Sequence, residues 1–204
     1  CSRAARFSIT AKFVIPIIEV MQKNFNLPLV ITTEKSPTDA VPEYCKKNNI
    51  SYLSVSSLTD PNLKSLIINL KSEIAVLADF GLLIPEKILN AFPKGIINIH
   101  PSLLPKYRGP TPVQTAILNG EKEIGVSIIK LDEEIDHGPI LSQEKEEILP
   151  QDTAQSLYER LFKKGGKILP DTITKYLNGN LKSVAQNHKN ATLTKTLTRK
   201  DGFI

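Results

Sequence analysis

Two polar side chains end an otherwise apolar run, where they could act together on a carbonyl group. Residues 95–100, GIINIH, have the apolar pattern of a buried strand. Alternate residues of a strand share a face, so the Asn98 amide and the His100 imidazole are predicted to point the same way. Such a pair can stabilise a developing oxyanion, and the imidazole can also move a proton. The alternative interpretation is structural: Asn98 tethers the following loop, and His100 is a hydrogen-bonded core residue.

The acidic segment 132–138, DEEIDHG, is the second candidate. Four carboxylates so close together are most often a solvated turn. Asp136 differs from the others because it follows Ile135 and lies between two apolar segments. A partly buried aspartate near a histidine would orient the imidazole and stabilise its protonated form. A metal site is not expected, because the spacing does not suit one and no second histidine pair lies nearby.

Strands that alternate with helices are expected to position these residues. Strands are predicted near residues 7–10, 27–33, 50–55, 74–78 and 95–100, and helices over 13–21, 42–48, 60–70 and 85–92. This alternation predicts an α/β fold with an open, mainly parallel, Rossmann-like sheet that is covered by helices on both faces.

The second half of the chain is predicted to have a different order of helices and strands. A helix over 111–118 and two strands over 125–131 and 140–148 are predicted. A capping box near Thr153 predicts the start of a helix that is interrupted at Gly165-Gly166. A separate helical piece is expected over 171–177, and beyond Gly179 the loss of apolar residues predicts a linker.

Length and composition exclude several classes of protein. The chain has 204 residues, 41% of them hydrophobic, which suits one globular domain. All ten glycines lie at or beyond Gly81, so neither a P-loop nor a dinucleotide fingerprint can follow an early strand. No apolar stretch approaches the roughly 20 residues of a membrane helix, and no secretory leader is recognised. Cys1 and Cys45 form no metal spacing and no disulfide framework, so a cytoplasmic protein is expected.

Positive charge is concentrated near the end of the chain. The formal net charge is +5, and residues 181–204 contribute five basic residues against one aspartate. A basic tail can bind nucleic acid. A solvated lysine-rich terminus is an equally good interpretation of the charge alone.

The segment 98–141, NIHPSLLPKYRGPTPVQTAILNGEKEIGVSIIKLDEEIDHGPIL, resembles the folate-dependent formyltransferase family. The N-x-H-x-S-L-L-P core is shared by the whole family. The continuation Y-R-G-x-x-P-x-Q is typical of methionyl-tRNA formyltransferases and of sugar-nucleotide formyltransferases. Residues 78–85, ADFGLLIP, are similar to the segment that lines the family's folate pocket. Residues 191–202, ATLTKTLTRKDG, are similar to the linker before the C-terminal domain of the tRNA enzymes.

The resemblance implies transfer of a formyl group from 10-formyltetrahydrofolate to the amino group of methionyl initiator tRNA, without a metal. Asn98, His100 and Asp136 match the family's catalytic residues. The residues implied in folate binding are Phe80, Gly81, Leu82, Leu83, Ile84, Ser102, Leu103, Leu104, Pro105, Asp132, Glu133 and Ile135. Those implied on the acceptor side are Tyr107, Arg108 and Gln114.

The resemblance also implies a domain organisation. Residues 1–180 are expected to form a catalytic domain with the formyltransferase fold, and residues 181–204 a linker toward a missing or truncated C-terminal domain. A monomer with no membrane partner is expected. Ile9 stands where the family has a glycine-containing turn, and the loop over 34–42 is short and not basic. These departures leave two alternatives: a sugar-nucleotide N-formyltransferase, and a non-catalytic remnant that binds folate or RNA.

Overall fold

The computed structural model describes residues 11–33, 40–198 and 201. The predicted strand near residues 7–10 and most of the loop after Thr33 lie outside these residues. No helix within the described ranges has the length and apolarity needed to span a bilayer. The elements, in chain order, are the short 3-10 helix η1 (Ala11–Val14), α1 (Ile15–Asn24), β1 (Val30–Thr33), α2 (Ala40–Lys47), β2 (Tyr52–Val55), α3 (Pro61–Asn69), β3 (Ala75–Ala78), α4 (Glu86–Leu89), β4 (Ile96–His100), α5 (Pro112–Leu118), β5 (Glu123–Lys130), β6 (Ile140–Glu147), α6 (Ala154–Leu177) and the 3-10 helix η2 (His188–Asn190).

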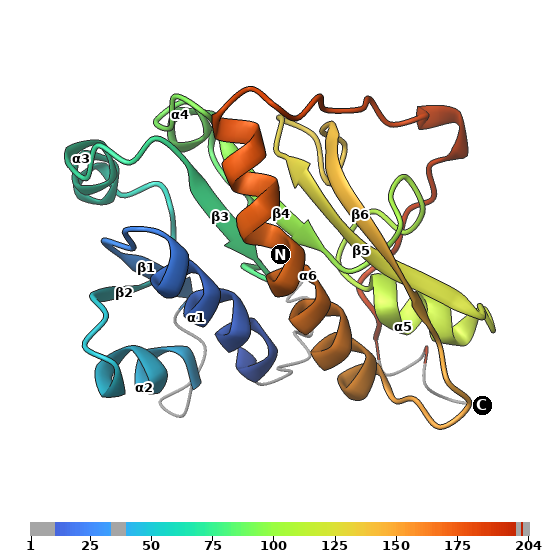
Figure 1. Cartoon of the computed structure of the whole chain (residues 1–204). Coiled ribbons are helices and arrows are strands. Elements are labelled where there is room, and N and C mark those ends of the chain that lie inside the picture. Colours follow the sequence, from blue (N-terminus) through green and yellow to red (C-terminus); the bar gives the residue numbers. More distant parts are fainter. Residues whose placement is uncertain (1–10, 34–39, 199–200, 202–204) are drawn as a thin grey trace.

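The strands form two short sheets (Figure 1). β1 and β2 pair in parallel. The second sheet has the order β3-β4-β5-β6, in which β3 and β4 are parallel and the other two pairs are antiparallel. The predicted α/β class is confirmed. The β5–β6 pair is antiparallel because the acidic segment that joins the two strands is too short for a parallel crossover.

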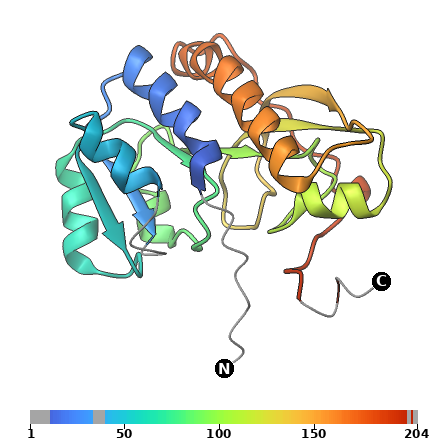
Figure 2. The ribbon, with the colours of Figure 1, turned by 90° about the horizontal axis from the view of Figure 1, so that it is seen from below.

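Helices cover both faces of the sheets, with α1 and α6 side by side on one face and α3 and α4 on the other (Figures 1 and 2). Successive side chains of β4 point alternately toward the two layers of helices. Ile97 and Ile99 belong to the core cluster that includes α1 and α6, whereas Ile96 belongs to the cluster that includes α3 and α4. Asn98 and His100 therefore share the face of Ile96.

The predicted interruption of the last long helix at Gly165-Gly166, with a separate helical piece after it, is wrong. α6 runs unbroken for 24 residues. A Cβ on Gly165 would lie 2.9 Å from Ile99 Cγ2, and one on Gly166 would lie 3.3 Å from Ile17 Cδ1. The glycines allow α6 to approach β4 and α1 closely, and this packing outweighs the low helix propensity of glycine.

A buried carboxylate fixes the start of α6, where the predicted capping box at Thr153 is confirmed. Asp152 accepts hydrogen bonds from the Arg160 guanidinium, the Ser156 hydroxyl and the Leu149 backbone N–H. Its side chain is 3% exposed. Burial acts to raise the pKa of Asp152, but the hydrogen bonds from Arg160, Leu149 and Ser156 and the charge of Arg160 hold it below its ordinary value.

Asp152→Asn should therefore destabilise the chain by about 2 kcal/mol near neutral pH, because it weakens hydrogen bonds to a charged group. The folded-state pKa is depressed, so the carboxylate's contribution is present above the ordinary value of 3.8 and is lost as the pH falls below it. Urea unfolding at about pH 7 and about pH 3 measures this difference. The matched control is Asp171→Asn, in an exposed pair with Lys175 on the same helix, for which we expect about 0.5 kcal/mol or less. An equal loss for Asp152→Asn at both pH values would contradict the ionic role.

The chain after α6 folds back along the molecule (Figure 1). Val184 forms a bridge with Ile140 at the start of β6, and Leu193 forms one with Arg108 in the loop after β4. The segment therefore holds the loop after β4 in place. That residues 181–204 lead toward a further domain stays a prediction.

Candidate active site

Asp136 joins the two polar residues of β4 in one cluster. Asn98 Nδ2 donates a hydrogen bond to Asp136 Oδ1 over 3.1 Å. The Gly109 backbone N–H donates to Asp136 Oδ2 over 2.9 Å, and His100 Nδ1 lies 3.4 Å from the same oxygen. The structure thus brings together the three residues predicted to be catalytic.

His100 is held at both of its ring nitrogens. Nε2 lies 2.9 Å from the backbone carbonyl oxygen of Tyr107. A carbonyl can only accept a hydrogen bond, so Nε2 carries a proton and donates it. Nδ1 then faces the Asp136 carboxylate, with which it forms an ion pair whenever the ring carries a second proton. A proton exchanged at this ring would therefore pass through the Nδ1 edge, beside Asp136.

Left-handed backbone conformations shape this cluster. Tyr107 and Asp136, the two residues that contact the His100 ring, have φ values of 60° and 49°. Such conformations are strained for residues other than glycine and occur where surrounding contacts impose them, often at functional sites. Gly109 also has a left-handed φ of 104°, and a Cβ there would lie 2.9 Å from the Thr194 carbonyl oxygen. Because residue 109 is a glycine, its backbone N–H can reach Asp136 while the segment around Thr194 packs closely against it.

The loop that follows β4 is folded onto β5 through Ser127. The Ser127 hydroxyl donates to the Ser102 carbonyl over 2.5 Å and accepts from the Leu104 amide over 3.1 Å. Ser102 and Leu104 are both buried, and the Leu104–Pro105 peptide bond is cis. This stretch of the predicted folate site, which also includes Leu103, is therefore held against β5 by Ser127.

The other predicted folate residues lie on two loops. The segment from Phe80 to Ile84 leaves β3 beside His100, because Ala78 lies opposite Ile99 in the sheet. Phe80, Leu82 and Ile84 pack against the cluster under α3 and α4, whereas the side chains of Leu83, Glu133 and Ile135 are exposed, as is Gly81. Their contact with folate stays a prediction.

A buried guanidinium is connected to the cluster through the side chain of Gln186. Arg108 is 6% exposed, and its Nε and Nη2 donate to Gln186 Oε1 over 3.1 and 2.7 Å. Nη2 also contacts His188 Nδ1 at 2.9 Å. Gln186 Nε2 donates in turn to the carbonyl oxygens of Asp136 and Gly138, over 2.9 and 2.7 Å. The structure therefore gives Arg108, predicted on the acceptor side, a partner within the chain.

The other predicted acceptor residues also have partners within the chain. The Tyr107 hydroxyl donates to Glu121 Oε1 over 2.6 Å, and burial together with this hydrogen bond raises the pKa of Tyr107. Gln114 Oε1 accepts from the Tyr158 hydroxyl over 3.2 Å. Burial, reinforced by the charge of Asp79, raises the pKa of Tyr158. It is the Tyr107 carbonyl, rather than its side chain, that contacts His100.

Asp132 and His137 pair with each other within the acidic segment. Asp132 Oδ2 lies 2.6 Å from His137 Nδ1. The His137 ring stacks on His188 with centroids 4.2 Å apart. Within residues 11–33, 40–198 and 201, no three side chains of His, Cys, Asp or Glu are grouped so that they could hold a metal ion.

Two residues of the site were missed by sequence reasoning. Ser127 had a local signal, because it is a polar residue in the middle of the apolar strand GVSII. Gln186 had none, because it lies in a segment with the composition of a linker. Its role appears only when the chain is folded.

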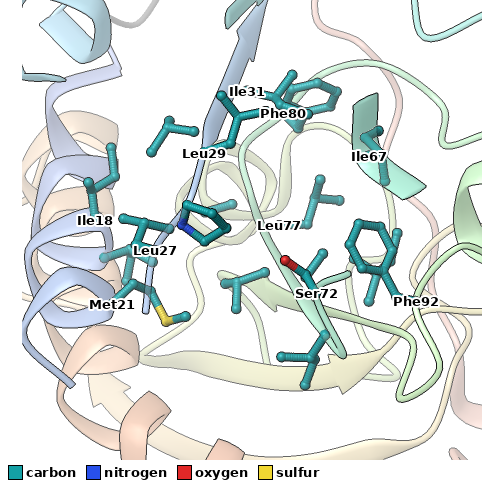
Figure 3. A pocket seen from close by; sticks show the side chains of 18 of the residues that line it. Ile18, Met21, Leu27, Leu29, Ile31, Ile67, Ser72, Leu77, Phe80 and Phe92 are labelled. Carbon is teal, nitrogen blue, oxygen red and sulfur yellow. The ribbon is translucent and has the colours of Figure 1, made fainter. Parts of the chain in front are cut away.

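A cavity of about 520 Å³ lies between β1 and β3, apart from the cluster of Asn98, His100 and Asp136. Figure 3 shows Ile18 and Met21 of α1, Ile31 of β1 and Leu77 of β3 around this space. Asn98, His100 and Asp136 do not line it, although Asp79 and Phe80 do. The cavity therefore adjoins the candidate site without containing it.

Comparisons with known proteins match most of the chain. A family model described as formyl transferase matches residues 18–173. The methionyl-tRNA formyltransferase of Buchnera aphidicola subsp. Schizaphis graminum is 42% identical over 159 residues, which are 78% of this chain and 50% of that protein. The chain thus spans about half the length of curated relatives of this kind.

Solved structures show the same fold. A phosphoribosylglycinamide formyltransferase from Bacillus halodurans superposes with a TM-score of 0.70 and 29% identity, over 82% of this chain and 91% of that one. An N-formyltransferase from Helicobacter canadensis, in complex with folinic acid and dTDP-3-aminofucose, has a TM-score of 0.70 and 25% identity, over 93% of this chain and 68% of that one. The predicted formyltransferase fold is confirmed.

Proposed function

The chain belongs to the formyl transferase family, and we propose that it transfers a formyl group from 10-formyltetrahydrofolate to the amino group of methionyl initiator tRNA. The observation that carries this proposal is the contact of one carboxylate, that of Asp136, with both Asn98 and His100. It supplies hydrogen-bond donors for an oxyanion and an acceptor for a proton in one place.

The proposed reaction begins when the amine nitrogen attacks the formyl carbon, so that the carbonyl oxygen becomes an oxyanion. The Asn98 amide has a second N–H beyond the one given to Asp136. This group, together with the Nδ1–H that His100 carries when its ring is doubly protonated, would stabilise the oxyanion. The bond from the formyl carbon to N10 of the folate then breaks. Asp136, acting through water, would take the proton that the amine loses while N10 gains one. This chemistry uses no metal.

Folate binding is assigned to the loops around the cluster. Phe80–Ile84, Ser102–Pro105 and the acidic segment with Asp132, Glu133 and Ile135 would surround the pterin, largely through backbone groups. The folate complex of the Helicobacter canadensis relative supports this donor class.

The tRNA acceptor is favoured by two observations. The relative named for methionyl-tRNA is 42% identical, whereas the Helicobacter canadensis N-formyltransferase in complex with dTDP-3-aminofucose is 25% identical. The similarity of residues 191–202 to the linker of the tRNA enzymes points the same way. Tyr107, Arg108 and Gln114 remain proposed on the acceptor side. We further propose that the protein acts in translation initiation, as a monomer in the cytoplasm.

Calorimetric titration with 5-formyltetrahydrofolate, a stable mimic of the donor, tests the donor site first. We expect one-to-one binding in the micromolar range, followed by formyl transfer from 10-formyltetrahydrofolate to methionyl-tRNA. Binding without transfer to any amine would favour the non-catalytic remnant and overturn the proposed activity. Transfer only to an amino sugar nucleotide would overturn the acceptor. A folded sample that does not bind the folate would overturn the donor site.

A further inference from the structure

Two successive peptide units in the loop after β4 face the candidate site. The first contributes the carbonyl of Tyr107, which accepts a hydrogen bond from His100 Nε2 over 2.9 Å. The second contributes the N–H of Gly109, which donates to Asp136 Oδ2 over 2.9 Å. The direction of these two backbone groups therefore helps to set the tautomer of His100 and the position of the Asp136 carboxylate.

The opposite ends of both units belong to Arg108 and are held by the returning segment, residues 192–195. The Arg108 N–H donates to the Thr192 carbonyl over 2.9 Å. The Arg108 carbonyl accepts from the Thr194 N–H over 2.7 Å and from the Thr194 hydroxyl over 3.0 Å. The two backbone bonds form the parallel bridge between Arg108 and Leu193. Each peptide unit thus has one end at the candidate site and the other on a segment far along the chain.

A peptide unit transmits direction because it is planar. In a trans unit the N–H and C=O groups point in opposite directions, so a contact that fixes one group also aims the other. The loop needs such contacts, because Tyr107 and Gly109 have left-handed φ values of 60° and 104°. A left-handed conformation is strained for a tyrosine, and it persists only where the surrounding structure imposes it.

The Thr194 side chain holds the loop on both sides of Gly109. Besides donating to the Arg108 carbonyl, its hydroxyl accepts from the Thr111 N–H over 3.2 Å. We propose that Thr194 is a positioning residue for the Asp136 carboxylate, which it orients through the Gly109 N–H. The inference rests on the proposed function, in which Asp136 takes part in the proton step. It extends the functional unit beyond the catalytic domain that the sequence predicts.

Thr194→Val tests this proposal, because valine has nearly the same volume and lacks the hydroxyl. We expect kcat for formyl transfer to fall about tenfold, since a small misplacement of the Asp136 carboxylate is costly, while the KM for folate stays within a few-fold. Thr194→Ser keeps the hydroxyl and should retain kcat. The matched control is Thr196→Val, at an exposed position in the same stretch of chain, which should change neither quantity. Equal losses of kcat in Thr194→Val and Thr194→Ser would overturn the proposal.

The amide proton of Gly109 gives a readout in NMR spectra that does not depend on formyl transfer. Its hydrogen bond to a carboxylate should place the signal at low field, and Thr194→Val should move it upfield, whereas Thr194→Ser and Thr196→Val should not. Thr194→Ala, which removes the hydroxyl without adding an atom, repeats the measurement if Thr194→Val does not fold. An unchanged Gly109 signal in a folded variant without the hydroxyl would overturn the positioning role. The expected shift in a chain that transfers no formyl group would support that role and contradict the proposed function alone.

Discussion

His100→Ala should lower kcat for formyl transfer about a hundredfold or more, while the affinity for 5-formyltetrahydrofolate stays within a few-fold of the original. The imidazole lies between the Tyr107 carbonyl and the Asp136 carboxylate, and the proposed mechanism uses it in the oxyanion and proton steps. Because the ring is 5% exposed, its loss should affect the reacting centre far more than the folate surface. Single-turnover transfer assays and calorimetry measure the two quantities separately.

His137→Ala is the matched control for this prediction. His137 is the residue after Asp136, and it pairs with Asp132 and stacks on His188, outside the catalytic cluster. We expect its kcat to remain within a few-fold of the original. The double variant His100→Ala/Asp136→Ala should lose little more than His100→Ala alone, because residues that act as a unit are not additive. Unchanged turnover in His100→Ala would remove His100 from the mechanism.

The elements whose pattern is local could be predicted from the sequence. Asn98 and His100 share a face because side chains alternate along a strand, whichever strands lie beside it. Asp60 begins α3 as its position before Pro61 predicts, since its carboxylate accepts from the Asn62 amide. The continuity of α6 was not predictable in this way. It depends on the fit of Gly165 against Ile99 of another element, which no local propensity contains.

In the candidate site, too, some contacts could be predicted from the local sequence and others could not. Asp136 was predicted from its place between apolar segments, and its contact with Asn98 is observed over a separation of 38 residues. The partners of Arg108 could not be predicted, because Gln186 lies 78 residues away in a segment without apolar periodicity. A buried guanidinium needs such partners. The sequence shows the arginine but not the segment that covers it.

Substitution of Gln186 should have the second large effect on activity, because this single side chain connects three parts of the chain. Its Oε1 accepts from Arg108, and its Nε2 donates to the carbonyl oxygens of Asp136 and Gly138. The amide is 4% exposed, so water does not readily replace it. Gln186 touches no reacting atom in the proposed chemistry and is therefore a positioning residue for the Asp136 loop.

Gln186→Leu should lower kcat by roughly tenfold to a hundredfold with little change in the KM for folate, because a shift of the Asp136 carboxylate by about 1 Å misplaces it for the proton step. It should also cost about 2 kcal/mol of stability, since the Arg108 guanidinium loses its acceptor. Gln186→Glu separates the two effects: a carboxylate can still pair with Arg108 but cannot donate to the Asp136 carbonyl. We therefore expect Gln186→Glu to retain most of the stability and still lose kcat, whereas the exposed control Gln151→Leu should change neither quantity. Full kcat in Gln186→Glu would mean that the side chain supports Arg108 alone and does not position Asp136.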